Sequence, residues 1–133
     1  MTRNRKSAKA AGARTERAVA DYLAQQLEDD RIDRRVKTGA KDRGDIAGIR
    51  LHGQRIVLEV KDCAKQTLAG WVAEAHLEAG NDDALVGLVV AKRRGTTDPG
   101  RWYVHCTVDD LLALLTGRRH GHRQDFAADG GDE

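Results

Sequence analysis

Asp45, Glu59 and Lys61 are the residues of this chain whose types and spacing could carry out chemistry. Glu59 and Lys61 end the otherwise apolar run 56–61, and Asp45 follows Gly44, fourteen residues before Glu59. Acidic side chains are rarely buried unless they are paired or bind a metal, and carboxylate oxygens are ligands that Mg²⁺ prefers. A nearby ammonium group can stabilise negative charge that develops on a phosphate. The pattern favours metal-dependent hydrolysis of a phosphodiester.

Two strands joined by a short loop are predicted to position these residues. Residues 45–50 and 55–61 have the apolar character of strands, and the segment between them reads as a three-residue hairpin loop that ends at Gly53. A glycine there supplies the left-handed conformation that such a loop requires at its last residue. In this register Arg50 pairs with Gln54.

The register brings the three candidate residues onto one face of the hairpin. Counting back from the loop places Asp45 opposite Glu59, and directly opposed residues of an antiparallel pair carry their side chains to the same face about 5 Å apart. Lys61, two residues beyond Glu59, shares that face because side chains alternate along a strand. A slip of one residue would turn Asp45 away, so the site depends on this register.

The remaining chain predicts an α/β domain in which helices flank a sheet. The 133 residues suit a basic arm at 1–12 that is expected to be disordered, one folded domain at 13–117 and a flexible tail at 118–133. Helices are predicted by apolar spacing of three and four residues, and strands by short apolar runs between turn signals. The expected elements are a helix over 13–28, strands over 31–38, 45–50 and 55–61, a helix over 65–79, strands over 84–91 and 101–106, and a helix over 108–115.

Composition excludes several classes of protein. Charged residues make up 33% of the chain, and the net charge of +2 conceals clusters of lysine and arginine that suit a polyanionic partner. Cys63 and Cys106 have the spacing of neither a zinc module nor a disulfide framework, and no apolar run is long enough to span a membrane. Ser7 is the only serine and no glycine-rich phosphate loop is present, which excludes serine-hydrolase and P-loop chemistry and argues against a nucleotide cofactor. We expect a soluble cytoplasmic protein.

The order of elements, together with Asp45 and the following Glu-x-Lys sequence, resembles the PD-(D/E)xK nuclease superfamily. The resemblance covers roughly residues 13–106, and the compact size and the early pair Glu16 and Arg17 are similar to the Holliday junction resolvases of archaea and phages. It implies a restriction-endonuclease-like core, with a central mixed five-stranded sheet flanked by helices in the order α-β-β-β-α-β-β-α, and by analogy a phage origin. Gly44 stands where the superfamily has its name-giving proline, a position expected mainly to shape the turn.

The resemblance also implies roles for the acidic residues and the lysine. Asp45 and Glu59 would be carboxylate ligands to Mg²⁺, for which Mn²⁺ could substitute, and the carbonyl oxygen of Val60 would be a further ligand. Glu16 would reach the same site from the first helix as a metal or water contact. A metal-activated water would attack the phosphate, with Lys61 orienting it or stabilising charge in the transition state.

Branched double-stranded DNA is the substrate that the resemblance implies, in recombination and repair. Resolution of a junction by two symmetric cuts implies a two-fold homodimer. Basic residues would hold backbone phosphates and so recognise shape rather than sequence. The predicted DNA-binding residues are Arg14, Arg17, Arg34, Arg35, Lys37, Lys41 and Arg43.

Other interpretations remain open at this point. A restriction-type or repair nuclease of the same superfamily would keep the site but act on linear or flap DNA. A non-catalytic nucleic-acid-binding module would use only the basic residues. A solvated strand face with a weak surface ion pair would also place Glu59 and Lys61 side by side.

Several further polar and aromatic residues have structural roles as their first interpretation. His76 is expected at a solvent-facing helix position, and Trp71 in the core or at a dimer interface. Lys65 and Gln66 follow the Glu-x-Lys strand and would either contact the phosphate or begin the next helix. His52 and His105 are expected in a turn and in strand packing.

Overall fold

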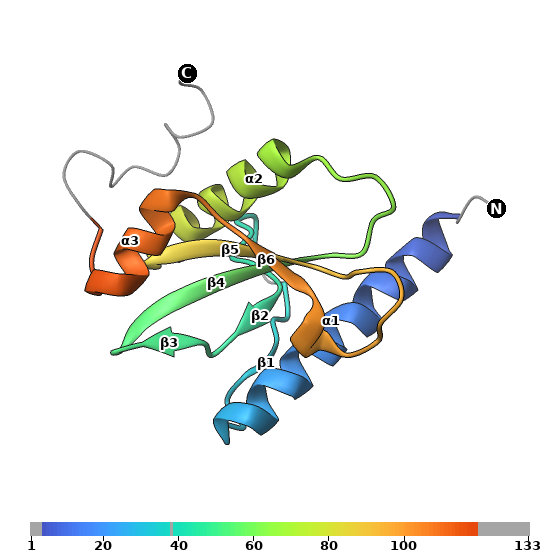
Figure 1. Ribbon diagram of the computed structural model, residues 1–133, viewed down its shortest axis with the longest axis horizontal. Coiled ribbons are helices and arrows are strands. Elements are labelled where there is room, and N and C mark those ends of the chain that lie inside the picture. Colours follow the sequence, from blue (N-terminus) through green and yellow to red (C-terminus); the bar gives the residue numbers. More distant parts are fainter. Residues whose placement is uncertain (1–3, 38, 120–133) are drawn as a thin grey trace.

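The apolar run that contains Glu59 and Lys61 forms the central strand, β4, of a mixed sheet (Figure 1). This sheet belongs to a computed structural model that describes residues 4–37 and 39–119. β4 pairs in parallel with β5 and antiparallel with β2 and β3, while β1 and β6 form the edges. The strands are β1 (Asp33–Arg34), β2 (Ile46–Ala47), β3 (Arg50–Leu51), β4 (Gln54–Lys61), β5 (Val86–Ala91) and β6 (Tyr103–His105).

Helices cover both faces of the sheet, so the predicted α/β class with a mixed sheet is confirmed (Figure 1). The alternate residues Ile56, Leu58 and Val60 of β4 belong to the main core cluster, to which α1 contributes, whereas Val57 packs against Ala79 of α2 on the opposite face. Alternation places Glu59 on the same face as Val57. The helices are α1 (Arg5–Leu27), α2 (Leu68–Asn81) and α3 (Val108–Thr116), with a 3₁₀ turn η1 (Pro99–Arg101).

The hairpin that precedes the site differs from the prediction in two ways that cancel. The turn has two residues, His52 and Gly53, both at positive φ, so Leu51 pairs with Gln54 and the expected pairing of Arg50 with Gln54 is wrong. One extra residue between β2 and β3 then shifts the register back. The glycine at position 48, with φ +93°, lies at this bulge.

Past the bulge the predicted register holds. Ile46 pairs with Leu58. Asp45, which directly precedes β2, bonds through its amide and its Oδ2 to Leu58 and Val60, the two residues that flank Glu59. The predicted strand 45–50 is therefore two short strands, β2 and β3, on either side of the bulge, so the sheet has six strands and not the predicted five. Asp45 therefore lies at the predicted position along β4, although the predicted turn was wrong.

The first helix begins at Arg5, so the expectation that residues 5–12 are disordered is wrong. The side chain of Asn4 caps the helix by accepting from the amide of Ser7 at 2.8 Å, and the alanine, lysine and arginine residues that follow are strong helix formers. The strand expected over 31–38 is limited to β1. Residues 118 and 119 have neither helix nor strand, and the rest of the predicted tail lies outside the described residues.

His76 is 1% exposed, so its predicted solvent-facing position is wrong. Its Nε2 lies 2.7 Å from Oδ2 of Asp110, a buried residue that also closes a capping box with Thr107 at the start of α3. Arg119 approaches the other oxygen of Asp110 at 3.3 Å. This buried polar network joins α2, α3 and the chain that follows α3.

Gly87 on β5 lies directly under α2. A Cβ at this position would lie 2.2 Å from the carbonyl oxygen of Ala75, a distance that no real side chain tolerates. The missing side chain lets the helix approach the sheet closely. Among the described residues, no helix has the length and apolar character needed to cross a membrane.

Candidate functional site

Asp45 is fixed to β4 by both its backbone and its side chain. Its amide N–H donates to the carbonyl oxygen of Leu58 at 2.8 Å, and its Oδ2 accepts from the amide of Val60 at 2.8 Å. The preceding Gly44 has φ +96°, and a Cβ there would lie 2.7 Å from Cγ1 of Val57. Proline has φ fixed near about −65° and cannot take this conformation. The residue that departs from the superfamily pattern is thus the one that lets this chain approach β4.

Asp45, Glu59 and Lys61 come together near the carboxyl end of β4. Asp45 and Glu59 are each 6% exposed, and Nζ of Lys61 lies 3.2 Å from Oε2 of Glu59. Burial and the charge of Glu59 raise the pKa of Asp45 to about 7, and burial raises the pKa of Glu59 as well. A divalent cation placed between such carboxylates would relieve their repulsion.

Two further acidic residues, Glu74 and Glu78 of α2, complete the site and were not predicted. Oε1 of Glu74 lies 2.8 Å from Nζ of Lys61. Oxygen atoms of Glu59, Glu74 and Glu78 all lie within 4.8 Å of one another. Although burial lowers the pKa of Lys61, its bonds to Glu74 and Glu59 raise that pKa overall, so the ammonium remains charged. Lys61 therefore lies between Glu59 of β4 and Glu74 of α2.

Glu78 is the most buried member of the group, at 1% exposure. Burial and then the neighbouring Glu59 raise its pKa to about 10. The sequence contains a pattern from which the position of Glu78 could have been inferred. Residues 71, 75 and 79 form the buried stripe of α2, and acids at 74 and 78 lie along the edge of that stripe at the same four-residue spacing.

Glu16 approaches the site from α1, as predicted, but it already has a partner. Its Oε1 lies 3.0 Å from a guanidinium nitrogen of Arg34 on β1. Its negative charge is near enough to contribute to the raised pKa of Asp45. Glu16 therefore lies within electrostatic reach of Asp45 and is held by a basic residue that was predicted to bind DNA.

The other predicted DNA-binding residues divide into two groups. Arg17 bonds to Asp33 at 2.7 Å and to Asp21 at 3.1 Å, and the half-buried Arg35 lies 3.3 Å from the buried Asp82. These two arginines therefore hold structural ion pairs. The remaining residues, which have exposed side chains, are Arg14, Lys37, Lys41 and Arg43.

Lys37, Lys41 and Arg43 belong to the segment that leads into Asp45. This segment lines a hollow of about 250 Å³. Burial lowers the pKa of Lys37, but Asp42, Asp45 and other acids raise it overall, which shows that its ammonium group lies within reach of the acidic site. The loop thus carries positive charge up to the edge of the site.

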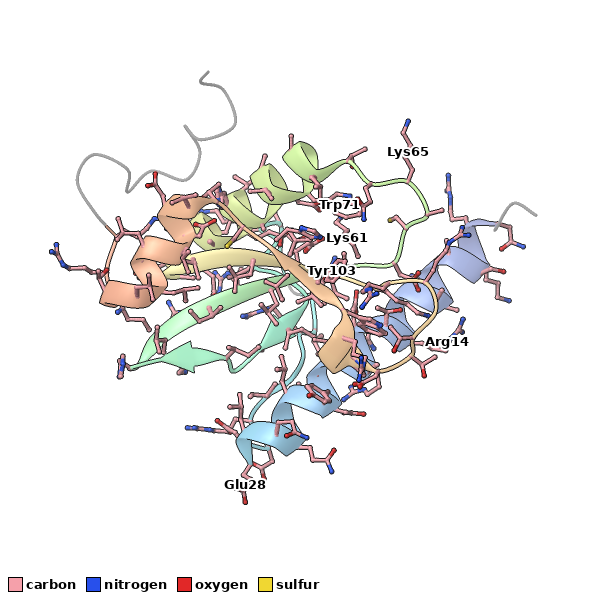
Figure 2. The ribbon with its side chains drawn as sticks, viewed as in Figure 1. Arg14, Glu28, Lys61, Lys65, Trp71 and Tyr103 are labelled. Carbon is pink, nitrogen blue, oxygen red and sulfur yellow. The ribbon has the colours of Figure 1, made fainter. Side chains whose placement is uncertain are left out.

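The remaining candidates have structural positions. Trp71 is 6% exposed and packs with Ala75 and Val89, so it is a core residue. Lys61 lies beneath α2, whereas Lys65 extends outwards from the loop before that helix (Figure 2). His52 is an exposed turn residue, as predicted.

The acidic group fits a hard divalent cation. Oε1 of Glu59 and both oxygens of Glu78 are buried and lack a hydrogen-bond donor among the described residues. Such cations take carboxylate oxygens as ligands. Glu59 belongs to two candidate ligand sets. Oxygen atoms of Glu59, Glu74 and Glu78 lie within 4.8 Å of one another, whereas the predicted set of Asp45, Glu59 and Glu16 is supported by the electrostatic influence of Glu59 and Glu16 on Asp45. The sequence predicted only the second set.

Comparison of the chain with protein-family models, with curated proteins and with solved structures found no significant match. The functional argument therefore depends on the geometry of the site.

Proposed function

We propose that the protein is a metal-dependent endonuclease that cuts branched double-stranded DNA, with the Holliday junction as its preferred substrate. The observation that carries the proposal is the burial of Asp45 beside Glu59, with Asp45 bonded to the residues on either side of Glu59 and Lys61 3.2 Å from Glu59. Placing two buried acids together is unfavourable without a compensating cation. A restriction-endonuclease-like core belongs to the same proposal, because a parallel central pair with antiparallel neighbours is compatible with it.

Each residue of the site has a role in this reaction. Asp45 and Glu59 would hold Mg²⁺, or Mn²⁺ in its place, with Glu16 and the carbonyl oxygen of Val60 as further contacts. The bound ion would lower the pKa of a water and polarise the phosphate. Lys61, whose pKa is raised, is protonated at neutral pH and suited to stabilise negative charge on the phosphate in the transition state. To do so, its ammonium group exchanges one of its two carboxylate partners for a phosphate oxygen.

The substrate and the assembly follow from charge and symmetry. Lys37, Lys41 and Arg43 lie beside the acidic site with exposed side chains that would contact phosphates, together with Arg14 on α1; Lys37 would do so in place of its contact with Asp42 at 3.7 Å. Contacts of this kind recognise the shape of the backbone rather than its sequence. Two symmetric cuts in one junction require two active sites, which a two-fold homodimer provides.

A non-catalytic nucleic-acid-binding protein is the second candidate. The observation that favours it is the ion pair between Lys61 and Glu74, which occupies the ammonium group at 2.8 Å. If this pair is permanent, Lys61 has only a structural role. Cutting activity separates the two candidates.

The test compares a four-way junction, a linear duplex and a flap, each labelled and incubated with Mg²⁺. We expect symmetric nicking of the junction by the wild type, and loss of nicking with retained binding in Asp45→Asn and Lys61→Ala. Asp21→Asn, an exposed acid of α1, is the matched control and should cut normally. Equal cutting of all three substrates would indicate a nuclease of a different specificity. Binding without any cutting would support the second candidate.

A further inference from the structure

A groove adjoins the proposed active site at the end of the sheet where the parallel strands β4 and β5 finish. The loop after β4 and the loop after β5 leave the sheet at this end, beside the first half of α1 (Figure 1). Together they line a hollow of about 570 Å³. Its lining includes Asp62, Lys92, Arg93, Arg94 and Thr96.

The groove begins one residue beyond Lys61 along the chain. Lys61 is paired with Ala91, and the amide of Lys92 donates to the carbonyl oxygen of Lys61 at 2.9 Å. Arg94 lies only three residues beyond Ala91, which limits its distance along the chain to about 10 Å. A strand whose phosphate lies at Lys61 would therefore have its next one or two phosphates over the groove.

The groove carries an excess of positive charge. Its lining includes three basic side chains and one carboxylate, Asp62. Nζ of Lys92 lies 4.0 Å from Asp62, a weak contact that leaves the ammonium group accessible. Arg94 is exposed, and among residues 4–37 and 39–119 it forms no ion pair. An arginine in this situation is available for a phosphate.

Hydrogen bonds and a ring contact hold the loop after β5, which carries these basic side chains, in place. The indole of Trp102 donates to the carbonyl oxygen of Thr96 at 3.0 Å, and the amide of Asp98 donates to the hydroxyl of Thr96 at 3.1 Å. The guanidinium group of Arg93 donates to the carbonyl oxygen of Arg101 and lies 4.5 Å from the ring centre of Tyr103. These bonds hold the loop in one shape with its basic groups at the rim, so a ligand would not have to order it.

We propose that this groove binds the sugar-phosphate backbone of the cut strand, at one or two phosphates from the scissile phosphate, with Arg94 as the principal contact and Lys92 as the second. The inference rests on the proposed nuclease function for the position of the cut, whereas the binding of a phosphate backbone in the groove can be measured without cutting. It adds to the predicted DNA-binding residues a second surface, on the other side of the acidic site from Lys37 and Lys41.

The test measures binding of a labelled four-way junction and a labelled linear duplex by fluorescence anisotropy in EDTA, over 50–200 mM salt. Each phosphate contact contributes a slope of about −0.9 to the logarithm of affinity against the logarithm of salt concentration. We expect Arg94→Ala to weaken binding about 5- to 10-fold and to reduce the slope by about 1. Arg94→Lys should restore the slope, because the charge is kept. Arg50→Ala, an exposed arginine beside the opposite end of β4, is the matched control and should leave both quantities unchanged.

The outcomes separate the two proposals. If the wild type binds but never cuts, and Arg94→Ala still reduces the slope, the groove is supported and the nuclease proposal fails. If the wild type cuts and Arg94→Ala has wild-type affinity and slope, the groove inference is overturned alone. An equal loss in Arg50→Ala would also overturn it, because the effect would then be one of total charge. Absence of any DNA binding by the wild type would overturn both.

Discussion

Lys61 on β4 and Glu74 on α2 form an ion pair with 2.8 Å between Nζ and Oε1. The pair connects β4 with α2, a helix in which the sequence predicted no residue of the acidic site. Glu74 has 42% of its side chain exposed, so the pair itself stabilises the fold by less than about 1 kcal/mol. Its importance is that it controls where the ammonium group is held.

Glu74→Gln should therefore separate the effect of the orientation of Lys61 on the rate of cutting from the effect of its charge. We expect single-turnover cutting of a labelled junction to change by no more than about 10-fold, whereas Lys61→Ala should reduce it by at least about 100-fold, because only the second change removes the charge that faces the phosphate. Equal losses in the two variants would instead make Glu74 a member of the reacting group.

The pH dependence of stability without metal follows from Asp45 and Glu78. Burial and Glu59 raise the pKa of Asp45 from 3.8 to about 7, so between these values the folded state keeps a proton that the unfolded state has lost. The free energy of unfolding must then fall as pH rises from about 4 to about 7. Glu78, with its pKa raised from 4.5 to about 10, extends the fall to more alkaline pH.

Asp45→Asn should reduce the fall in the free energy of unfolding between about pH 4 and about pH 7. At pH 8 in EDTA we expect the variant to be more stable than the wild type by on the order of 1–3 kcal/mol, with a much smaller difference at pH 4. Urea unfolding at both values measures the change, and Asp21→Asn provides the exposed control. A difference that is the same at both values would mean that the pKa of Asp45 is not raised.

A divalent cation should reverse this destabilisation. At 10 mM, Ca²⁺ or Mg²⁺ with a dissociation constant of about 1 mM would stabilise the folded state by about 1.4 kcal/mol and raise Tm by a few degrees. Two variants distinguish the possible ligand sets. If Asp45 and Glu59 hold the ion, Asp45→Asn abolishes the shift and Glu78→Gln retains it. The opposite result would assign the ion to Glu59, Glu74 and Glu78.

The buried network around Asp110 should be essential for stability and separate from catalysis. Asp110→Ala removes a cap of α3 and a partner of His76 and Arg119, for which we expect a loss of about 3–5 kcal/mol in urea unfolding. Asp109→Ala, one residue earlier in the same turn, is the control and should cost less than half as much. Equal losses would show that helix capping by charge, rather than the network, accounts for the effect.

The sequence predicted the parts of the site that depend on alternation along a strand. Glu59 and Lys61 share a face because they are two residues apart, and Asp45 reaches them because its register with β4 is fixed by a turn and a bulge whose effects cancel. That cancellation is not visible in the letters. A two-residue turn at His52 and Gly53 would by itself have displaced Asp45.

The contribution of α2 could not be predicted in the same way. Helical spacing shows that Glu74 and Glu78 lie along the edge of the buried stripe, but not which strand that stripe covers or how closely. The start of α1 at Arg5 was missed for a different reason. The residues after Asn4 have few apolar side chains, so the helix there depends on a cap and on intrinsic propensity rather than on a periodic pattern.

The missing side chain of Gly87 sets the height of α2 above the sheet, and with it the width of the space in which Glu59 meets Glu74 and Glu78. A methyl group at position 87 would push α2 away from the sheet. It would leave every charged residue of the chain unchanged. Gly87→Ala is thus a way to widen the space between these acidic residues without changing their chemistry.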